Sequence, residues 1–216
     1  LVAQKDELVA SLRQAKYADL LPQYPDVTYV PGRAHLTPDG AVMVGDAAYR
    51  SGKVIIATGT SPAAPAIPGL DTVPWLTSTT AMELEELPAS LLVIGGGVIG
   101  VELGQMFARF GVLVTIVCRS RLLPGAEPEV SAALADYLRA EGVEVRSGVS
   151  YEAIRQAGNG GVELVARDTE GTAVTLFAER VLVATGRTPN TAGMGLEEAG
   201  VVLDSRGAVQ VDDRMR

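Results

Sequence analysis

The sequence predicts an α/β fold: a doubly wound parallel sheet with an antiparallel β-meander beside it. The first observation is a short apolar run, Leu91 to Ile94, that has the character of a buried parallel strand and ends at a glycine-rich turn. The second is the pattern that follows, in which a helix, a strand, a second helix and a third strand succeed one another. This β-α-β-α-β order is the half-unit that binds one mononucleotide in a doubly wound sheet.

The glycine-rich turn has the spacing G-x-G-x-x-G, supplied by Gly95, Gly97 and Gly100. In a Rossmann-like site the first glycine permits the tight turn and the second lets the backbone approach a pyrophosphate. The third lets helix and strand pack closely. The phosphates would face the free N–H groups and the positive dipole end of the next helix. We therefore predict a dinucleotide site here, with a purely structural turn as the alternative.

The first third of the chain predicts a helix and several short strands. Residues 1–21 carry the pattern of an amphipathic helix that ends near Pro22. Short β segments are expected at 27–30, 33–37 and 41–44, and 53–57 is a buried-strand candidate that ends in Thr58-Gly59. Four prolines in the next stretch, 61–74, indicate a stiff connector and a domain boundary.

The remaining elements follow from caps, apolar runs and turn signals. Ser78 or Thr79 is expected to cap a short helix that reaches Leu87. The helix after the glycines should run from Val98 to Phe110. We then expect a strand at 112–117, a helix at about 128–141, a strand at 143–145, a meander at 149–154, 161–168 and 173–178 with a turn at 158–161, a strand at 181–184, and tail strands at 201–203 and 208–211.

Composition limits the classes of function. The 216 residues carry a net charge of −8, which argues against nucleic-acid or anionic-membrane partners. No apolar run approaches the roughly 20 residues of a membrane span, and no secretory pattern is present. The single cysteine, Cys118, cannot form an internal disulfide or a metal cluster. We therefore expect a cytoplasmic protein with no metal site in this chain.

Several motifs together resemble a known family. They are the stretch from Ile94 to Glu102, the Ala-Thr-Gly strand ends at 57–59 and 184–186, and Gly186-Arg187-Thr188-Pro189-Asn190. These motifs resemble the flavoprotein pyridine nucleotide-disulfide oxidoreductases. Within that family the chain is most similar to the mercuric reductases, and that closer match is carried by residues 12–17, 57–62, 67–70, 77–79 and 114–120. The resemblance covers essentially the whole chain. It implies three parts: residues 1–72 as the end of the first FAD-domain segment, 73–188 as the NAD(P)-binding domain, and 189–216 as the start of the returning FAD-domain segment.

The resemblance also implies what the chain lacks. The family's FAD-binding glycine motif, its C-x4-C redox pair and its C-terminal interface domain have no counterpart here. The chain begins without methionine inside a helical pattern and stops at Met215-Arg216, so we expect a piece of a longer protein. That protein is expected to be a homodimer that passes electrons from NADPH to FAD, to a cysteine pair and then to Hg(II). The piece alone is not expected to be catalytically complete.

The end of the second strand predicts the choice of cofactor. An acidic residue there would suit the ribose hydroxyls of NADH, but Cys118 occupies the position and Arg119, Ser120 and Arg121 follow. A guanidinium can form a forked pair with a 2′-phosphate. We therefore favour NADPH over NADH, with solvated surface charge as the alternative role for both arginines.

The resemblance supplies the rest of the predicted site. It implies that Val98 lines the nicotinamide pocket and that Glu102 lies near the nicotinamide and the flavin, with a simple helix-start carboxylate as the alternative. No catalytic residue is predicted in this chain. The predicted cofactor-binding residues are Gly95, Gly97, Val98, Ile99, Gly100, Glu102, Arg119, Ser120, Arg121 and Gly186.

Two other functions compete with this interpretation. A dihydrolipoamide dehydrogenase-like enzyme would share the fold, although an acidic residue at position 118 would have favoured it. A non-catalytic module that senses a dinucleotide would also share the fold, because fold alone does not determine function. A C-x4-C pair upstream in the parent protein would favour catalysis.

Overall fold

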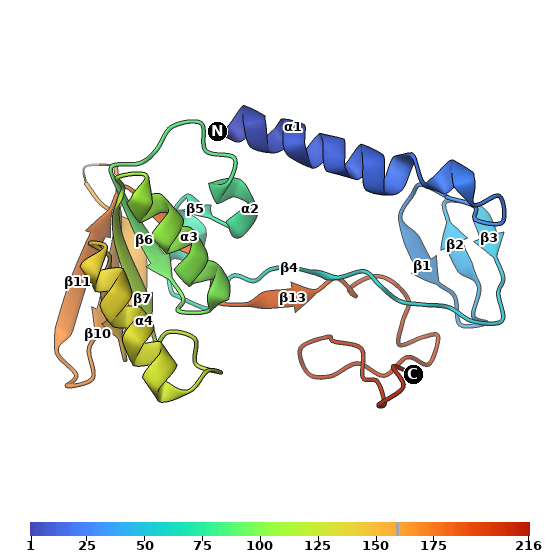
Figure 1. Ribbon diagram of the computed structural model, residues 1–216. Helices are drawn as coiled ribbons and strands as arrows, with labels where there is room; N and C mark the ends of the chain where they lie inside the picture. Colours follow the sequence, from blue (N-terminus) through green and yellow to red (C-terminus); the bar gives the residue numbers. More distant parts are fainter. Residues whose placement is uncertain (159) are drawn as a thin grey trace. The chain divides into compact units, whose positions relative to one another are not determined.

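The computed structural model describes residues 1–158 and 160–216 (Figure 1). Asn159, in the turn expected at 158–161, lies outside the described residues. By their contacts the described residues form two compact units: Pro62–Arg187, and Leu1–Ser61 together with Thr188–Arg216. The predicted α/β fold class is confirmed, because the structure combines a five-stranded parallel sheet with antiparallel sheets.

The parallel sheet lies in the Pro62–Arg187 unit and has the strand order β5-β12-β6-β7-β8. Its central strands are buried because both of their faces are covered, which explains their continuous apolar runs. The strands are β5 (Trp75–Leu76), β6 (Ser90–Ile94), β7 (Leu113–Cys118), β8 (Glu144–Ser147) and β12 (Arg180–Val183).

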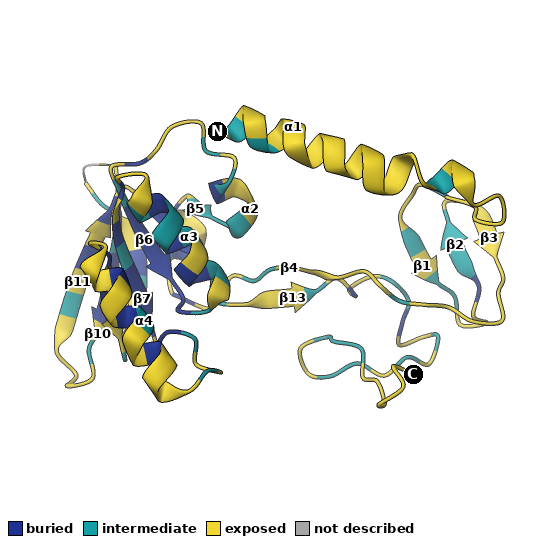
Figure 2. Ribbon diagram, in the orientation of Figure 1, coloured by how far each residue is buried: buried dark blue, intermediate teal, exposed yellow. Residues whose placement is uncertain are grey.

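The two faces of this sheet have different covers (Figures 1 and 2). Helices α3 (Val98–Arg109) and α4 (Pro128–Ala140) pack on one face. The meander packs on the other, formed by β9 (Ser150–Gln156), β10 (Val162–Arg167) and β11 (Ala173–Ala178). Successive side chains of a strand point to opposite faces. Leu91 and Val93 of β6 accordingly belong to the helix-side core, whereas Leu92 and Ile94 belong to the meander-side core.

The proline-rich stretch at 61–74, expected as a connector, also contributes residues to a hydrophobic core. It begins with β4 (Thr60–Pro62) and contains a 3-10 turn, η3 (Leu70–Thr72). Ile67, Leu70 and Val73 are buried in the meander-side core. The stretch from Pro62 onward therefore packs against the unit that contains the parallel sheet.

The short helix after β5 differs from its prediction at both ends. Helix α2 spans Ser78–Ala81, and its cap is Thr77 rather than Ser78 or Thr79. Thr80 N donates to Thr77 Oγ1 at 3.1 Å, and Thr77 N donates to Thr80 Oγ1 at 2.9 Å. This reciprocal pair is a capping box, with threonine in place of the usual glutamate. The helix also stops well before Leu87.

The other unit has little core of its own. Helix α1 (Val2–Arg13) continues through a π-helical turn, η1 (Gln14–Ala18), toward a 3-10 turn, η2 (Leu21–Gln23). An antiparallel sheet follows, made of β1 (Ala34–Leu36), β2 (Val42–Val44) and β3 (Ala47–Tyr49). Among the described residues of this unit, Ala41 and Leu196 are the only buried apolar side chains. No helix in the described part of the chain is long and apolar enough to cross a bilayer.

Four strand predictions in this unit are wrong. Residues 27–30 and 53–57 form no strand, and Ile55 is 90% exposed. The tail strands reduce to one bridge between Leu203 and Val209. The apolar run at 53–57 has strand character, but a strand needs a neighbour, and none lies beside it in the described residues. Short strands were also missed, including β3, β5 and β13 (Arg187–Pro189), which pairs with β4.

Candidate functional site

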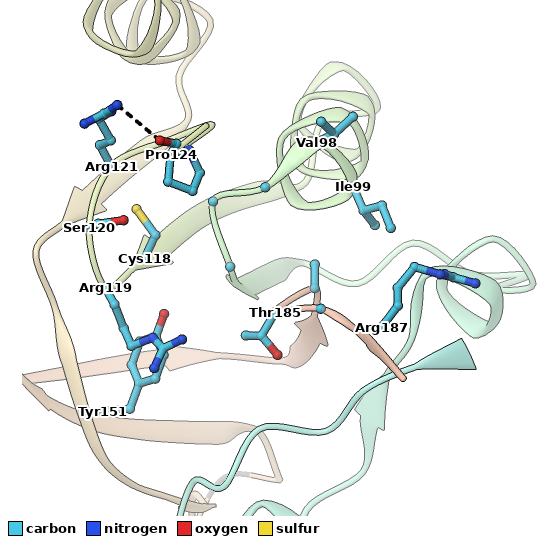
Figure 3. Close-up of a pocket in the computed structure, with 15 residues that line it drawn as sticks. Val98, Ile99, Cys118, Arg119, Ser120, Arg121, Pro124, Tyr151, Thr185 and Arg187 are labelled. Atoms are coloured by element: carbon cyan, nitrogen blue, oxygen red, sulfur yellow. Dashed lines mark hydrogen bonds between the residues drawn. The ribbon is translucent and has the colours of Figure 1, made fainter. Parts of the chain in front are cut away.

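A cavity of about 340 Å³ opens at the carboxyl edge of the parallel sheet (Figure 3). Its walls come from the residues that follow three adjacent strands: 95–99 after β6, 118–121 around the end of β7, and 184–187 after β12. Pro124 and Tyr151 complete it. Ligands of open α/β sheets bind in the crevice outside the carboxyl ends of the strands, so this cavity lies where the topology favours a site.

The three motif glycines lie here for different physical reasons. Gly95 has φ +123°, and a Cβ there would lie 2.3 Å from the carbonyl oxygen of Ala184. A Cβ at Gly100 would lie 2.2 Å from the carbonyl oxygen of Gly95, so this glycine lets α3 pack tightly against the turn. A Cβ at Gly97 would meet nothing within 4 Å, and its φ of −76° suits any residue. The fold therefore requires Gly95 and Gly100 but not Gly97.

Gly97 is also the N-cap residue of α3, and no side chain caps this end of the helix. The first N–H groups of a helix have no intrahelical partner, and the helix dipole makes this end attractive to anions. Val98, 60% exposed, and Ile99 line the cavity beside these groups. The edge of the cavity therefore combines open backbone N–H donors with two apolar side chains.

Cys118 ends β7 as a small buried residue. Its Sγ lies 3.6 Å from the Ser147 Oγ, and burial raises the pKa of the thiol, while the Ser147 contact opposes that rise. A Cβ at Gly96 would lie only 2.9 Å from the Cys118 Cβ. Gly96 and Cys118 therefore pack against each other beneath the cavity, and a larger residue at either position would push the glycine turn and β7 apart.

The two arginines that follow have different environments. Arg119 is exposed, lines the cavity, and has no hydrogen bond or ion pair with another residue in the described part of the chain. The Arg121 Nη2 donates to the carbonyl oxygens of Pro124 at 3.1 Å and Ala126 at 2.8 Å. In Figure 3 the Arg121 side chain points away from Arg119 and toward Pro124. Arg119 is thus available to a ligand, whereas Arg121 is engaged with its own loop.

That loop also contacts the glycine turn directly. Leu123 N donates to the Gly96 carbonyl oxygen at 2.7 Å, and Leu123 has a left-handed backbone with φ +44°. A left-handed conformation is uncommon for a residue other than glycine, so the surrounding contacts hold it in place. The Arg121 hydrogen bonds are part of that support, because they fix the carbonyls that follow Leu123.

Eight of the ten predicted residues line this cavity, and two do not. Gly100 lies behind the turn. Glu102 is exposed and is the fifth residue of α3, whose first turn carries no acidic residue, so a first-turn dipole effect does not apply to it. The lining residues that were predicted are Gly95, Gly97, Val98, Ile99, Arg119, Ser120, Arg121 and Gly186.

Sequence reasoning missed several lining residues. Ala184 and Thr185 could have been found, because they end the strand beside the glycine strand, and the carboxyl ends of parallel strands share one edge. Tyr151 comes from β9, in the meander, and no local pattern connects it with the glycine turn. Burial is the main cause that raises the pKa of Tyr151 to about 12. No cluster of three or more potential metal-ligating side chains occurs among the described residues.

Comparison with known proteins assigns the family. The family model described as "Pyridine nucleotide-disulphide oxidoreductase" matches residues 4–216. The chain belongs to this family. Pyridine nucleotide-disulfide oxidoreductases are flavoproteins that use FAD and NAD(P)H, so the dinucleotide expectation and the family resemblance agree.

Relatives among characterised proteins are oxidoreductases. The chain is 41% identical to a mercuric reductase of Staphylococcus aureus and 42% identical to one of Streptomyces lividans, each over 100% of its length. It is 39% identical, over 97% of its length, to "Dihydrolipoyl dehydrogenase 3" of Pseudomonas aeruginosa. The chain spans 39%, 46% and 46% of these relatives, so each of them is more than twice as long.

A solved structure agrees with this placement. The HOCl-induced flavoprotein disulfide reductase RclA from Escherichia coli matches with a TM-score of 0.86 at 31% identity. The match covers 99% of this chain and 48% of RclA. The structural match therefore agrees with the family assignment.

Proposed function

We propose that this chain is the NAD(P)H-binding portion of an FAD-dependent disulfide-type oxidoreductase of the mercuric reductase kind, and that it prefers NADPH to NADH. Residues 73–188 bind the dinucleotide, and residues 1–72 and 189–216 belong to the FAD domain. The chain alone is not catalytically complete. The whole protein is a cytoplasmic homodimer without nucleic-acid or membrane partners, and the rest of its FAD and interface domains completes the enzyme.

The observation that carries the cofactor assignment is the unpaired state of Arg119. This guanidinium stands exposed in the cavity wall after β7, and no carboxylate of the described residues neutralises it. An NADH site would have a carboxylate near the end of this strand, but the strand ends in the buried Cys118. A 2′-phosphate would supply the missing negative charge in a forked, charge-assisted pair.

The other residues of the cavity fit the rest of a dinucleotide. The open face of Gly97 and the uncapped N-terminus of α3 suit a pyrophosphate, since they offer N–H donors without a side chain in the way. Val98 and Gly186 would border the nicotinamide, which supplies hydride to the flavin when both cofactors are bound. Glu102, on the exposed face of α3, would lie near this meeting point in the whole protein.

Two acceptors remain in competition. The mercuric reductase relatives favour Hg(II) as the final acceptor, reached through a cysteine pair outside this chain. The 39% identity to a dihydrolipoyl dehydrogenase favours lipoamide as the second candidate. Turnover of the whole protein with NADPH and each acceptor separates the two, and turnover with neither would favour the sensing module.

The cofactor proposal is tested by calorimetric titration of the full chain with NADPH and NADH, beside Arg119→Ala. A charge-assisted hydrogen bond contributes about 1.5–3 kcal/mol, so the variant should bind NADPH about 10- to 150-fold more weakly. Its affinity for NADH should be unchanged. Equal affinity of the unmodified chain for the two dinucleotides would overturn the NADPH assignment, and binding of neither would overturn the dinucleotide site.

A further inference from the structure

We propose that Tyr151 is a positioning residue that holds Arg119 for the 2′-phosphate and so helps to determine the preference for NADPH. This inference deepens the proposed function and rests on it. Tyr151 lies outside the glycine motif and the arginine-bearing loop, in a strand of the meander.

The hydroxyl group of Tyr151 is fixed at the end of β7. It donates to the carbonyl oxygen of Val117 at 3.1 Å. The same carbonyl oxygen accepts from Gly95 N at 2.8 Å. One buried acceptor therefore connects the glycine turn, the end of β7 and the first residues of β9. Because Val117 lies two residues before Arg119, the phenol is anchored to the strand end from which the arginine extends.

The ring of Tyr151 is fixed as well. It packs against the meander-side core and also lines the cavity. An aromatic side chain has only two rotatable bonds, and here one end is held by packing and the other by a hydrogen bond. The ring is therefore a rigid part of the cavity wall, in contrast to the long and exposed side chain of Arg119.

Arg119 lines the same cavity as this ring. In Figure 3 its side chain leaves the end of β7 and overlaps Tyr151 in the view. Burial and then Cys118 raise the pKa of the phenol, and the positive charge of Arg119 opposes them as the smallest of the three causes. A guanidinium without a carboxylate partner can rest against an aromatic face. Such support restricts the arginine before a ligand arrives and reduces the entropy lost on binding.

The test is a double-mutant cycle on the full chain with Tyr151→Leu, Arg119→Ala and the double variant. Affinities for NADPH and NADH are measured for each protein by calorimetry. An aromatic–cation contact and its preorganisation predict that Tyr151→Leu weakens NADPH binding by about 3- to 10-fold. NADH binding should change less than about 2-fold. In the Arg119→Ala background the same substitution should have no further effect on NADPH, because Tyr151 acts through Arg119.

The outcomes separate this inference from the proposed function. Equal losses for NADPH and NADH, or the same loss in both backgrounds, would mean that Tyr151 serves the fold only and would overturn the inference. The proposed function would then still stand, since it fails only if the unmodified chain does not favour NADPH. If Tyr151→Leu does not fold, Tyr151→Phe replaces it. In Tyr151→Phe the hydrogen bond to the Val117 carbonyl is missing, so the ratio of NADPH affinity to NADH affinity should fall about 2- to 4-fold. An unchanged ratio would overturn the inference.

Discussion

Arg119 and Arg121 are two residues apart and identical in chemistry, yet their surroundings give them different tasks. Arg119 stands unpaired in the cavity wall, whereas Arg121 holds the carbonyl oxygens of Pro124 and Ala126. The Nε of Arg121 is buried without a hydrogen-bond partner among the described groups, which is a cost to the loop. The pair therefore forms a natural comparison between a ligand-facing and a loop-supporting arginine.

We expect Arg121→Ala to weaken the binding of NADPH and the binding of NADH by similar factors. The substitution releases two loop carbonyls and loosens the support of Leu123, whose N–H contacts the glycine turn. Loss of these hydrogen bonds should also reduce the free energy of unfolding by about 1–3 kcal/mol. Titration with both dinucleotides and denaturant unfolding measure the two effects. A loss confined to NADPH would instead make Arg121 a second phosphate ligand.

Tyr151 predicts a dependence of stability on alkaline pH. Its pKa is about 12 in the folded chain, principally because of burial, and about 10 in an unfolded chain. Between these values the folded state binds more protons than the unfolded state, so the free energy of unfolding falls as the pH rises from about 10 to 12. Denaturant unfolding of the chain and of Tyr151→Phe across this range measures the difference. The phenylalanine variant should show a shallower fall, and parallel curves would contradict the burial of the phenol.

The roles of individual residues were predictable where the glycine motif fixes their positions relative to the strand ends. The glycine spacing locates the first strand, and the next apolar run then locates the strand end at Cys118 and Arg119. The partners of Arg121 and the position of Tyr151 were not predictable. A guanidinium bonded to its own loop and one facing a ligand have the same local sequence character, and the contact of Tyr151 with Val117 joins residues far apart in the chain.

At the scale of elements, the glycine turn joins β6 to α3 and contains glycines with two different roles. Gly100 is required by the packing of the helix on the turn, and Gly97 faces open space. Gly100→Ala should therefore destabilise the fold by at least about 1–3 kcal/mol, since its Cβ would overlap backbone. Gly97→Ala should cost less than about 1 kcal/mol of stability, as a change at an N-cap, but should weaken dinucleotide binding. Thermal unfolding and titration of the two variants measure these effects.

The pair of glycine variants serves as its own control. Both replace glycine by alanine at one end of the same helix, but only Gly100 lies inside it, so helix propensity alone would favour Gly100→Ala and the expected loss of stability there must come from packing. If Gly97→Ala binds the dinucleotides as tightly as the unmodified chain, the pyrophosphate does not approach this backbone. If Gly100→Ala is as stable as the unmodified chain, the close packing of α3 on the turn is not required.

Elements were predictable where burial on both faces leaves a continuous apolar run. Strands β6, β7 and β12 lie within one or two residues of their predicted limits for this reason. The run at 53–57 has the same character and forms no strand, because strand formation depends on a pairing partner as well as on local composition. The cap of α2 moved to Thr77 because the side chain of Thr80 completes the reciprocal hydrogen bonds there.

At the scale of the whole molecule, the two units differ in how much core they contain. Nearly all buried apolar side chains belong to Pro62–Arg187, and Ala41 and Leu196 are those of the other unit. Burial of apolar surface is the main source of stability, so the two units should differ in resistance to unfolding. The assignment of the units to NAD(P)-binding and FAD-binding roles stays a prediction that rests on the family.

We expect limited proteolysis of the chain to begin in the exposed segment at 53–59 and to leave a resistant core close to Pro62–Arg187. The Pro62–Arg187 unit, produced alone, should unfold in one cooperative transition and keep its affinity for dinucleotides. Mass spectrometry follows the time course of proteolysis, and thermal unfolding of the isolated Pro62–Arg187 unit tests its stability. Early cleavage within the parallel sheet would contradict the assignment of the core to this unit.

The paired strands β4 and β13 have a consequence for how such proteins can be recombined. Ala63 N donates to the carbonyl oxygen of Gly186 at 3.1 Å, so the chain enters and leaves the Pro62–Arg187 unit at neighbouring points. A segment whose two ends are adjacent can replace a surface loop of a host protein without stretching either. Cofactor preference could therefore be exchanged between relatives as a single cassette, cut at these two strands, with Arg119 and Tyr151 transferred together.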